Sequence, residues 1–369
     1  MRFWPRKALR GFALIVLLCA MTTGSGSLAH SSEWPPDHGR ETRPSTAGTQ
    51  SEATTSAPVV QIVSRLPAKF GATAVAWSPD GRLLAIIGGL NQHISVWEPR
   101  AAKLLWEAAS EFSGGGRALA FSNDGRLVLV PATKLGTSDQ PYTLTLWDAA
   151  KGTIVGDVDG PSPNDGWVGN FARALAVDRS HELMAVVTGG RVGQPVGIYD
   201  MRHWTLEGRI VVPGDIAEVG AFGPDGTLAI GTAGRKIALF DARTRALKRV
   251  IDAGQHVSSL AYGPNGKYIA SGHADLPDPI RIWSTADGAM VHSYVGRFSV
   301  VSGLAWSPNG RYIASASFDN TIRLWPCTDE REGEIITTFE KGGWSVAFSP
   351  DGTLLAAAGG EGIVVFEIK

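Results

Sequence analysis

Cysteine is nearly absent from this chain of 369 residues, which contains only Cys19 and Cys327. Cys19 lies in an N-terminal apolar segment, and loss of that segment would leave Cys327 without a partner for an intramolecular disulfide. We therefore expect packing, and not cross-linking, to hold the fold together. Cys327 is then either a small buried side chain beside Pro326 or a free thiol that joins two chains.

An excess of charge of one sign is also lacking. The 34 Lys and Arg residues nearly balance the 35 Asp and Glu residues, and neither sign gathers into a long block. Binding to the phosphates of nucleic acid needs a concentrated basic stripe. We therefore expect no nucleic acid partner.

Catalytic and metal-binding motifs are missing as well. The chain has no His-Glu-x-x-His helix, no Gly-x-Ser-x-Gly elbow and no phosphate loop ending in Gly-Lys-Ser or Gly-Lys-Thr. Its eight His residues are scattered, with no pair at the spacing of zinc ligands. These absences favour a protein with no catalytic residues, no cofactor and no preset metal site.

One polar cluster stands apart from these patterns. His273, Asp275 and Asp278 occur within the Pro-containing stretch HADLPDP. Carboxylates and an imidazole in one loop are able to bind a cation. A solvated turn explains the same residues without any ligand and is the simpler hypothesis.

The N-terminal apolar run, Gly11 to Met21, is too short to cross a bilayer, for which about 20 residues are needed. Basic residues precede it and small residues follow it as far as Ala29, which is the pattern of a secretory signal. We expect residues 1–29 to be cleaved as a signal peptide and the protein to be periplasmic or secreted. Retention of the segment as a membrane anchor is the alternative. Lipidation of Cys19 is disfavoured by Leu18, where a lipoprotein signal normally has a small residue.

Residues 30–57 are rich in Ser, Thr, Pro and Gly and have no apolar periodicity. A segment of this composition cannot bury enough apolar surface to order itself. We expect a flexible linker over residues 30–57, followed by one globular part over residues 58–369.

What the chain does contain is a repeat, clearest in Gly303 to Trp325, GLAWSPNGRYIASASFDNTIRLW. The Ser-Pro-Asn-Gly stretch after the first apolar run predicts a tight turn, in which Pro presets φ and Gly takes the left-handed position. Alternating apolar residues on both sides of this turn, and again after Asp319-Asn320, predict three antiparallel strands.

The unit recurs along the chain. Its turn returns as WSPDG, FSNDG, FGPDG, YGPNG and FSPDG, while the third copy has Val-Asp-Arg-Ser-His at residues 177–181 instead. The third strand of each copy ends in one of seven aromatic residues: Trp97, Trp147, Tyr199, Phe240, Trp283, Trp325 and Phe366. The last four spacings between them are 41, 43, 42 and 41 residues, within the roughly 40 to 45 residues of a four-stranded propeller blade. Seven copies predict an all-β fold, a seven-bladed β-propeller.

At these residues the chain resembles the WD-repeat propeller family, over Pro58 to Lys369. A literal Trp-Asp pair occurs at Trp147-Asp148. The match is closest at Ser315, Ala316, Ser317, Asp319 and Thr321 to Trp325. In this family the N-terminal strand completes the last blade. The resemblance implies the same here, because the last repeat supplies only three strands and Val59 to Leu66 has no local partner.

In this family a His before the first strand, a Ser or Thr on the second, an Asp in the next turn and the Trp of the third strand form a hydrogen-bonded set. The resemblance implies such a set from Ser315 or Ser317, Asp319 and Trp325, with Arg297 standing at the His position. The strand-end aromatics Trp97, Trp147 and Trp283 are expected to have a structural role in the core, since aromatic side chains bury a large apolar area.

The resemblance also implies that the connections between second and third strands and those between blades share one face, called the top face here. The longest connections fall on this face in blades 2, 3 and 5. Loops on a rigid scaffold carry recognition, and Trp and Arg are frequent interface anchors. We expect a partner site on the top face, centred between blades 2 and 3, among Trp167, Phe171, Arg173, Arg191, Arg235, Arg297 and Phe318. The alternative is that some of these aromatics pack beneath the loops.

The sequence therefore favours an exported protein-interaction module or scaffold that binds an unidentified protein or peptide. Two alternatives stay open, because a fold of this kind hosts both binding proteins and enzymes. One is a small-ligand-binding or hydrolytic propeller similar to lactonases. The other is a purely structural component of a wall or envelope.

Overall fold

The computed structural model describes residues 58–68, 71–88, 93–109, 118–129, 143–159, 172–274, 278–296, 299–327 and 333–369. All of them belong to the compact unit Ser31–Lys369. The segments expected to be a signal peptide and a linker lie outside the described residues. Among those residues, no helix has the length and apolar character that a membrane span requires.

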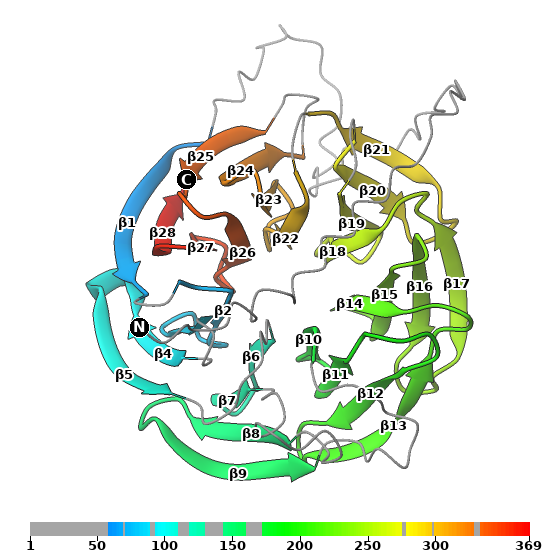
Figure 1. Cartoon of the computed structure of the whole chain (residues 1–369), viewed down its shortest axis with the longest axis horizontal. Helices are drawn as coiled ribbons and strands as arrows, with labels where there is room; N and C mark the ends of the chain where they lie inside the picture. Colours follow the sequence, from blue (N-terminus) through cyan, green and yellow to red (C-terminus); the bar gives the residue numbers. More distant parts are fainter. Residues whose placement is uncertain are drawn as a thin grey trace, which may run out of the picture. The chain divides into compact units, whose positions relative to one another are not determined.

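The described residues form seven antiparallel sheets of four strands, arranged in a ring (Figure 1). The prediction of a seven-bladed β-propeller is therefore confirmed. In each of blades 1 to 6 the four strands follow one another along the chain, and the first strand is the innermost. The innermost strands of neighbouring blades contact one another all the way round, including β26 of blade 7 with β2 of blade 1.

The strand bounds follow the repeats. Blade 1 contains β2 (Ala74–Trp77), β3 (Leu84–Gly88), β4 (His93–Glu98), the short 3-10 helix η1 (Pro99–Ala101) and β5 (Lys103–Ala109). Blade 2 contains β6 (Leu119–Phe121), β7 (Arg126–Leu129), β8 (Thr143–Asp148) and β9 (Thr153–Asp159). Blade 3 contains β10 (Ala174–Asp178), β11 (Leu183–Val187), β12 (Pro195–Asp200) and β13 (Thr205–Val211). Blade 4 contains β14 (Ala217–Phe222), β15 (Thr227–Thr232), β16 (Lys236–Asp241) and β17 (Leu247–Asp252).

The remaining blades have the same order. Blade 5 contains β18 (Val257–Tyr262), β19 (Tyr268–His273), β20 (Ile280–Ser284) and β21 (Met290–Tyr294). Blade 6 contains β22 (Val301–Trp306), β23 (Tyr312–Ser317), β24 (Thr321–Pro326) and β25 (Glu334–Thr338). Blade 7 contains β26 (Gly343–Phe348), β27 (Leu354–Gly359), β28 (Gly362–Ile368) and, from the other end of the chain, β1 (Val60–Pro67).

Strand β1 closes the ring, as the sequence predicted. It pairs antiparallel with β28, from Val60 opposite Ile368 to Pro67 opposite Gly362. The buried Ser64 also donates from Oγ to the carbonyl oxygen of Pro99 in blade 1, at 2.7 Å. One strand therefore completes the sheet of blade 7 and also bonds to blade 1.

Similar bonds join other neighbours at the outside of the ring. A side chain on the outermost strand of one blade donates to a carbonyl at or just after the end of the third strand of the next blade. Besides Ser64 to Pro99, these bonds run from Trp106 to Ala149, from Arg249 to Ala286 and from Tyr294 to Pro326. Each of these carbonyls thus gains a partner from the adjacent blade, and the bonds link the two sheets.

The turns between first and second strands pack against one another on the face of the ring opposite to the top face. A Cβ added at Gly81, Gly266 or Gly352 would lie within 3.5 Å of a proline in the preceding blade's turn. These glycines also have positive φ, a conformation that favours glycine over residues with a Cβ. In the aberrant turn of blade 3, His181 takes the place of that proline and lies against Gly226. Its neighbour Asp178 accepts the backbone N–H of Ser180 and of His181, which holds the altered turn in shape.

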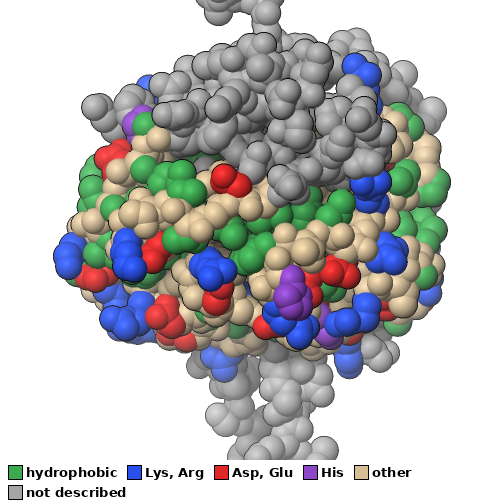
Figure 2. All heavy atoms as spheres, turned by 90° about the horizontal axis from the view of Figure 1, so that it is seen from below, with side chains coloured by type: hydrophobic (Ala, Val, Ile, Leu, Met, Phe, Trp, Pro, Cys, Tyr) green, Lys and Arg blue, Asp and Glu red, His purple; other side chains and the backbone are tan. Residues whose placement is uncertain are grey.

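Charges of both signs are interspersed over the side of the ring shown in Figure 2. Figure 1 places β5, β9 and β13 on this side. Strand β9 also carries two exposed apolar side chains, Ile154 and Val155. No large patch of one charge is seen on the described residues of this side, in keeping with the balanced composition.

Trp325 on β24 is one of the largest buried side chains, with 1% of its surface exposed. It packs between blades 5 and 6, where its ring centroid lies 5.0 Å from that of Tyr294. A Cβ at Gly333 would lie 2.3 Å from the indole, so the glycine leaves room for the ring. Neighbouring blades therefore interlock around this residue.

Replacing Trp325 with Ala should lower the free energy of unfolding by about 3 to 5 kcal/mol, because it removes a fully buried ring and leaves a cavity between two blades. Urea unfolding followed by circular dichroism measures this loss. Leu247→Ala is the matched control, since Leu247 is 48% exposed on β17. A loss for Trp325→Ala below about 1 kcal/mol, the range of surface positions, would contradict the packing described.

Candidate functional site

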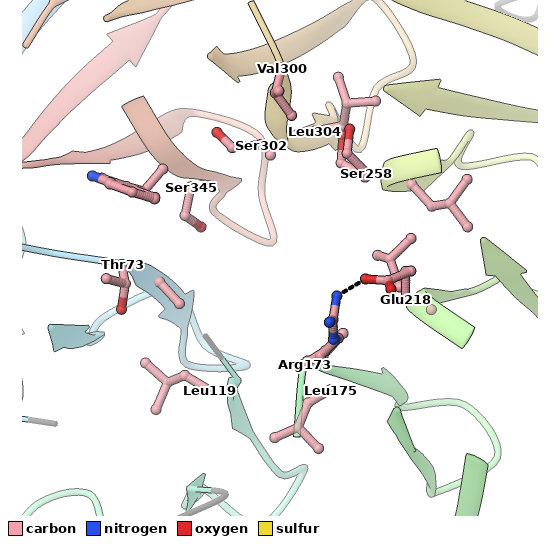
Figure 3. A pocket seen from close by; sticks show the side chains of 18 of the residues that line it. Thr73, Leu119, Arg173, Leu175, Glu218, Ser258, Val300, Ser302, Leu304 and Ser345 are labelled. Carbon is pink, nitrogen blue, oxygen red and sulfur yellow. Dashed lines mark hydrogen bonds and ion pairs between the residues drawn. The ribbon is translucent and has the colours of Figure 1, made fainter. Parts of the chain in front are cut away.

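A cavity of about 730 Å³ lies where the innermost strands meet (Figure 3). Every blade contributes to its wall, so the cavity belongs to the ring as a whole. Figure 3 labels Thr73, Leu119, Arg173, Leu175, Glu218, Ser258, Val300, Ser302, Leu304 and Ser345. His256, Phe318 and Trp344 also line it.

Irregularities in the innermost strands aim several of these side chains inward. The register between first and second strands skips Glu218 in blade 4, Ser258 in blade 5, Ser302 in blade 6 and Trp344 in blade 7. A bulge of this kind turns a side chain away from the regular alternation. All four skipped residues line the cavity.

The charged part of the wall is an ion pair between blades 3 and 4. Nη1 of Arg173, which directly precedes β10, donates to Oε2 of Glu218 on β14. The Arg173 side chain is 46% exposed, whereas that of Glu218 is 13% exposed. The guanidinium is therefore the more accessible member of the pair.

The hydroxyl groups of blades 5 and 6 are bonded to backbone. Ser258 Oγ lies 3.0 Å from the carbonyl oxygen of Gly272 and 2.8 Å from that of Val301, and its one hydrogen is donated to one of these two acceptors. Ser302 Oγ likewise lies 2.7 Å from the carbonyl oxygen of Gly343 in blade 7. The bonds to Val301 and Gly343 connect adjacent innermost strands, and the lone pairs of each hydroxyl are left for another partner.

An aromatic pair adds apolar surface to the cavity. Phe318 follows β23 and Trp344 lies on β26, with ring centroids 4.9 Å apart and planes inclined by 65°. Phe318 is 38% exposed and is the one aromatic side chain among the exposed large apolar residues of the described part of the chain. An edge-to-face pair with one exposed member is a suitable contact for an apolar side chain of a partner.

The residues expected to bind a partner are separated by the structure into three groups. Arg173 and Phe318, from blades 3 and 6, line the same cavity. Arg191 and Arg235 are exposed in the turns after β11 and β15, outside its wall. Trp167, Phe171 and Arg297 lie outside the described residues.

The strand-end tryptophans have different partners. Trp325 donates from Nε1 to Oγ of Ser315, at 2.9 Å, as in the set that the family resemblance implied. Asp319 instead accepts from Thr321, through its backbone N–H and its hydroxyl, and its own N–H donates to Oγ of Ser317. Trp97 donates to Ser95 on its own strand, and Trp147 stacks on Trp106 with centroids 5.7 Å apart.

Blade 5 contains a hydrogen-bonded set that sequence reasoning missed. Trp283 donates from Nε1 to Oγ of Ser271 (2.7 Å), which lies 2.8 Å from Nε2 of His273. Nδ1 of His273 lies 3.1 Å from the carbonyl oxygen of His256. A sequence signal existed, since alternation along β19 puts Ser271 and His273 on one face.

The hypothesis of a solvated turn is therefore wrong for His273, which is 0% exposed. Oδ2 of Asp278 lies 3.9 Å from Nη2 of Arg281. Asp275 lies outside the described residues. No group of three potential metal ligands occurs in the part of the chain that the structure describes. Cys327 is buried, and burial raises the pKa of its thiol to about 12, so it belongs to the packed core and is not a reactive thiol.

The buried His273 makes stability depend on pH. Burial lowers the pKa of its imidazole from 6.5 to about 4. The unfolded chain therefore takes up a proton in this interval that the folded chain does not, and stability falls as the pH drops through it. The expected slope is roughly 1.4 kcal/mol for each pH unit. Unfolding free energies measured from about pH 7 to about pH 5 should show this component in the wild type and lose it in His273→Gln. Equal slopes in the two proteins would contradict the assignment.

Comparison with known proteins agrees with the architecture. The model of the WD domain, G-beta repeat, matches residues 61–98, 247–275, 288–326 and 333–366. The chain is 25% identical over 260 residues to WD repeat-containing protein 1-B of Xenopus laevis, an alignment that covers 68% of this chain and 38% of that protein. The chain thus spans well under two thirds of that relative's length. With seven blades, closure by the N-terminal strand and matches in four repeats, the chain belongs to the WD-repeat family of β-propellers.

Proposed function

We propose that this chain is an exported protein-interaction module that binds a protein or peptide at the top face of the ring. WD-repeat propellers generally bind proteins or peptides. Export is supported by the signal-like pattern of residues 1–29. The partner is a segment that reaches the central cavity.

The observation that carries this proposal is the meeting of Arg173 and Phe318 at one cavity. These residues were singled out as interface anchors by type and by loop position, and they come from blades on different sides of the ring. Phe318 follows the second strand of its blade, and Arg173 precedes the first strand of its own. Both positions belong to the kinds of connection by which the top face was defined, and this supports a site there.

The cavity also has the composition of a binding site. Aliphatic side chains, among them Val75, Leu119, Leu175, Val219 and Leu304, form much of its wall. A few polar groups converge between them, which is the usual balance in sites that bury part of a ligand. Behind the innermost strands lie fully buried second strands, such as β15, β19 and β27, which supply a rigid support.

Replacing Phe318 with Ala should weaken capture of the partner by roughly 2 kcal/mol or more if it is a central anchor, because the ring loses its apolar contact. Melting should change little, since the side chain is partly exposed. Affinity capture from the native extract with the mature protein identifies the partner, and titration calorimetry then measures the difference. Ile154→Ala, an exposed position on β9, is the control.

Trp167→Ala belongs to the same experiment, because the sequence predicts that Trp167 lies near the same face. Unchanged binding by Phe318→Ala and Trp167→Ala, together with a loss for Trp204→Ala, would move the site to the opposite face. Trp204 lies in the turn between β12 and β13, which antiparallel order places on that opposite face.

A further inference from the structure

The two members of the ion pair in the central cavity differ in exposure, and this difference indicates what the cavity binds. The Arg173 side chain is 46% exposed and that of Glu218 is 13% exposed, so the guanidinium is the charged group more accessible to a ligand. We infer that the cavity binds an acidic segment of the partner, with a carboxylate of that segment paired with Arg173. This inference rests on the proposed function and specifies the chemistry of the partner.

Arg173 has donors available for this contact. A guanidinium carries five N–H donors in a planar fork, and the structure commits Nη1 to Glu218. A carboxylate fits the fork through two parallel hydrogen bonds, which are stronger than bonds between neutral groups.

The hydroxyl groups of Ser258 and Ser302 disfavour a carboxylate on the side of the cavity formed by blades 5 and 6. Figure 3 shows Ser302 across the cavity from Arg173. The single hydrogen of Ser258 and of Ser302 points to backbone carbonyls, so both residues offer lone pairs to the cavity. Lone pairs accept a peptide N–H and repel a carboxylate. The acid therefore lies toward blades 3 and 4, and backbone N–H groups of the bound segment lie toward blades 5 and 6.

The aromatic pair completes the recognition. Phe318 and Trp344 provide an apolar contact at the same cavity. A segment that combines an acidic side chain with a nearby apolar one can contact both Arg173 and the aromatic pair. A segment with a basic side chain would face the exposed guanidinium of Arg173, and like charges repel.

Glu218 then competes with the carboxylate of the partner for Arg173. In the free protein its carboxylate occupies part of the Arg173 fork, which is the position that the carboxylate of the partner needs. Removing the charge of Glu218 should therefore strengthen binding, whereas removing Arg173 should weaken it. A purely structural ion pair predicts a loss for both changes.

The test begins with a phage-displayed library of random peptides panned on the mature protein. The enriched peptides should carry Asp or Glu beside an apolar residue. A synthetic enriched peptide is then compared with its analogue in which Asp or Glu is replaced by Asn or Gln. The acidic peptide should bind the wild type roughly tenfold to a hundredfold more tightly than the amide analogue, the range of one charge-assisted hydrogen bond.

The variants decide the assignment. Arg173→Gln should bind the acidic peptide and its amide analogue equally. Glu218→Gln should bind the acidic peptide about two- to fivefold more tightly than the wild type, as expected from loss of a partly exposed ion pair. Arg235→Gln removes the same charge from an exposed turn outside the cavity and should leave both affinities unchanged.

The outcomes separate this inference from the proposed function. Enriched peptides that lose binding in Phe318→Ala but show no preference for acid over amide would overturn the inference alone. Weaker binding of the acidic peptide by Glu218→Gln would also overturn it, and this variant keeps the test decisive if Arg173→Gln folds poorly. A library that yields no peptide dependent on Phe318 would count against the proposed function itself.

Discussion

The pairing of β1 with β28 is the contact on which the rest of the structure depends. Each blade is a small sheet that buries its faces only against its neighbours, so a ring with an open end leaves two faces in water. Blade 7 receives its fourth strand from the N-terminal end of the described chain, and Ser64 on that strand bonds to Pro99 of blade 1. The last blade therefore cannot form completely until the first strand is in place.

Closure of the ring matters for the site because all seven blades together form the wall of the cavity. Most of its residues lie on or next to innermost strands, which contact the innermost and second strands of neighbouring blades. The contacts that cross from blade to blade, such as Ser258 to Val301 and Ser302 to Gly343, are short hydrogen bonds that tolerate little change in spacing. An opened ring would move Arg173, Glu218 and Phe318 relative to one another.

Much of the fold could be predicted because the same sequence pattern occurs several times along the chain. The turn sequence, the closing aromatic and the spacing agree in most copies, so an aberrant turn in blade 3 did not hide the blade. Closure was predictable because one alternating run and one incomplete repeat were each left without a partner.

The site was less predictable, because it depends on register. Nothing local in the sequence shows that Glu218, Ser258 and Ser302 are skipped between paired residues and so turned into the cavity. His273 was misjudged for a related reason, since its burial comes from the strand it ends and not from the Pro-containing stretch that follows. The expectation for Trp167 and Phe171 stays a prediction.

Removal of β1 tests the importance of closure most directly. A variant that lacks residues 58–68 should unfold at a lower temperature and over a broader range in calorimetry, with fast hydrogen exchange at the β28 amides that β1 covers. Adding a synthetic peptide of residues 58–68 should restore much of the lost stability, because the vacated edge accepts the same strand. If the shortened protein melts in one sharp transition at the temperature of the full chain, β1 does not hold the ring together.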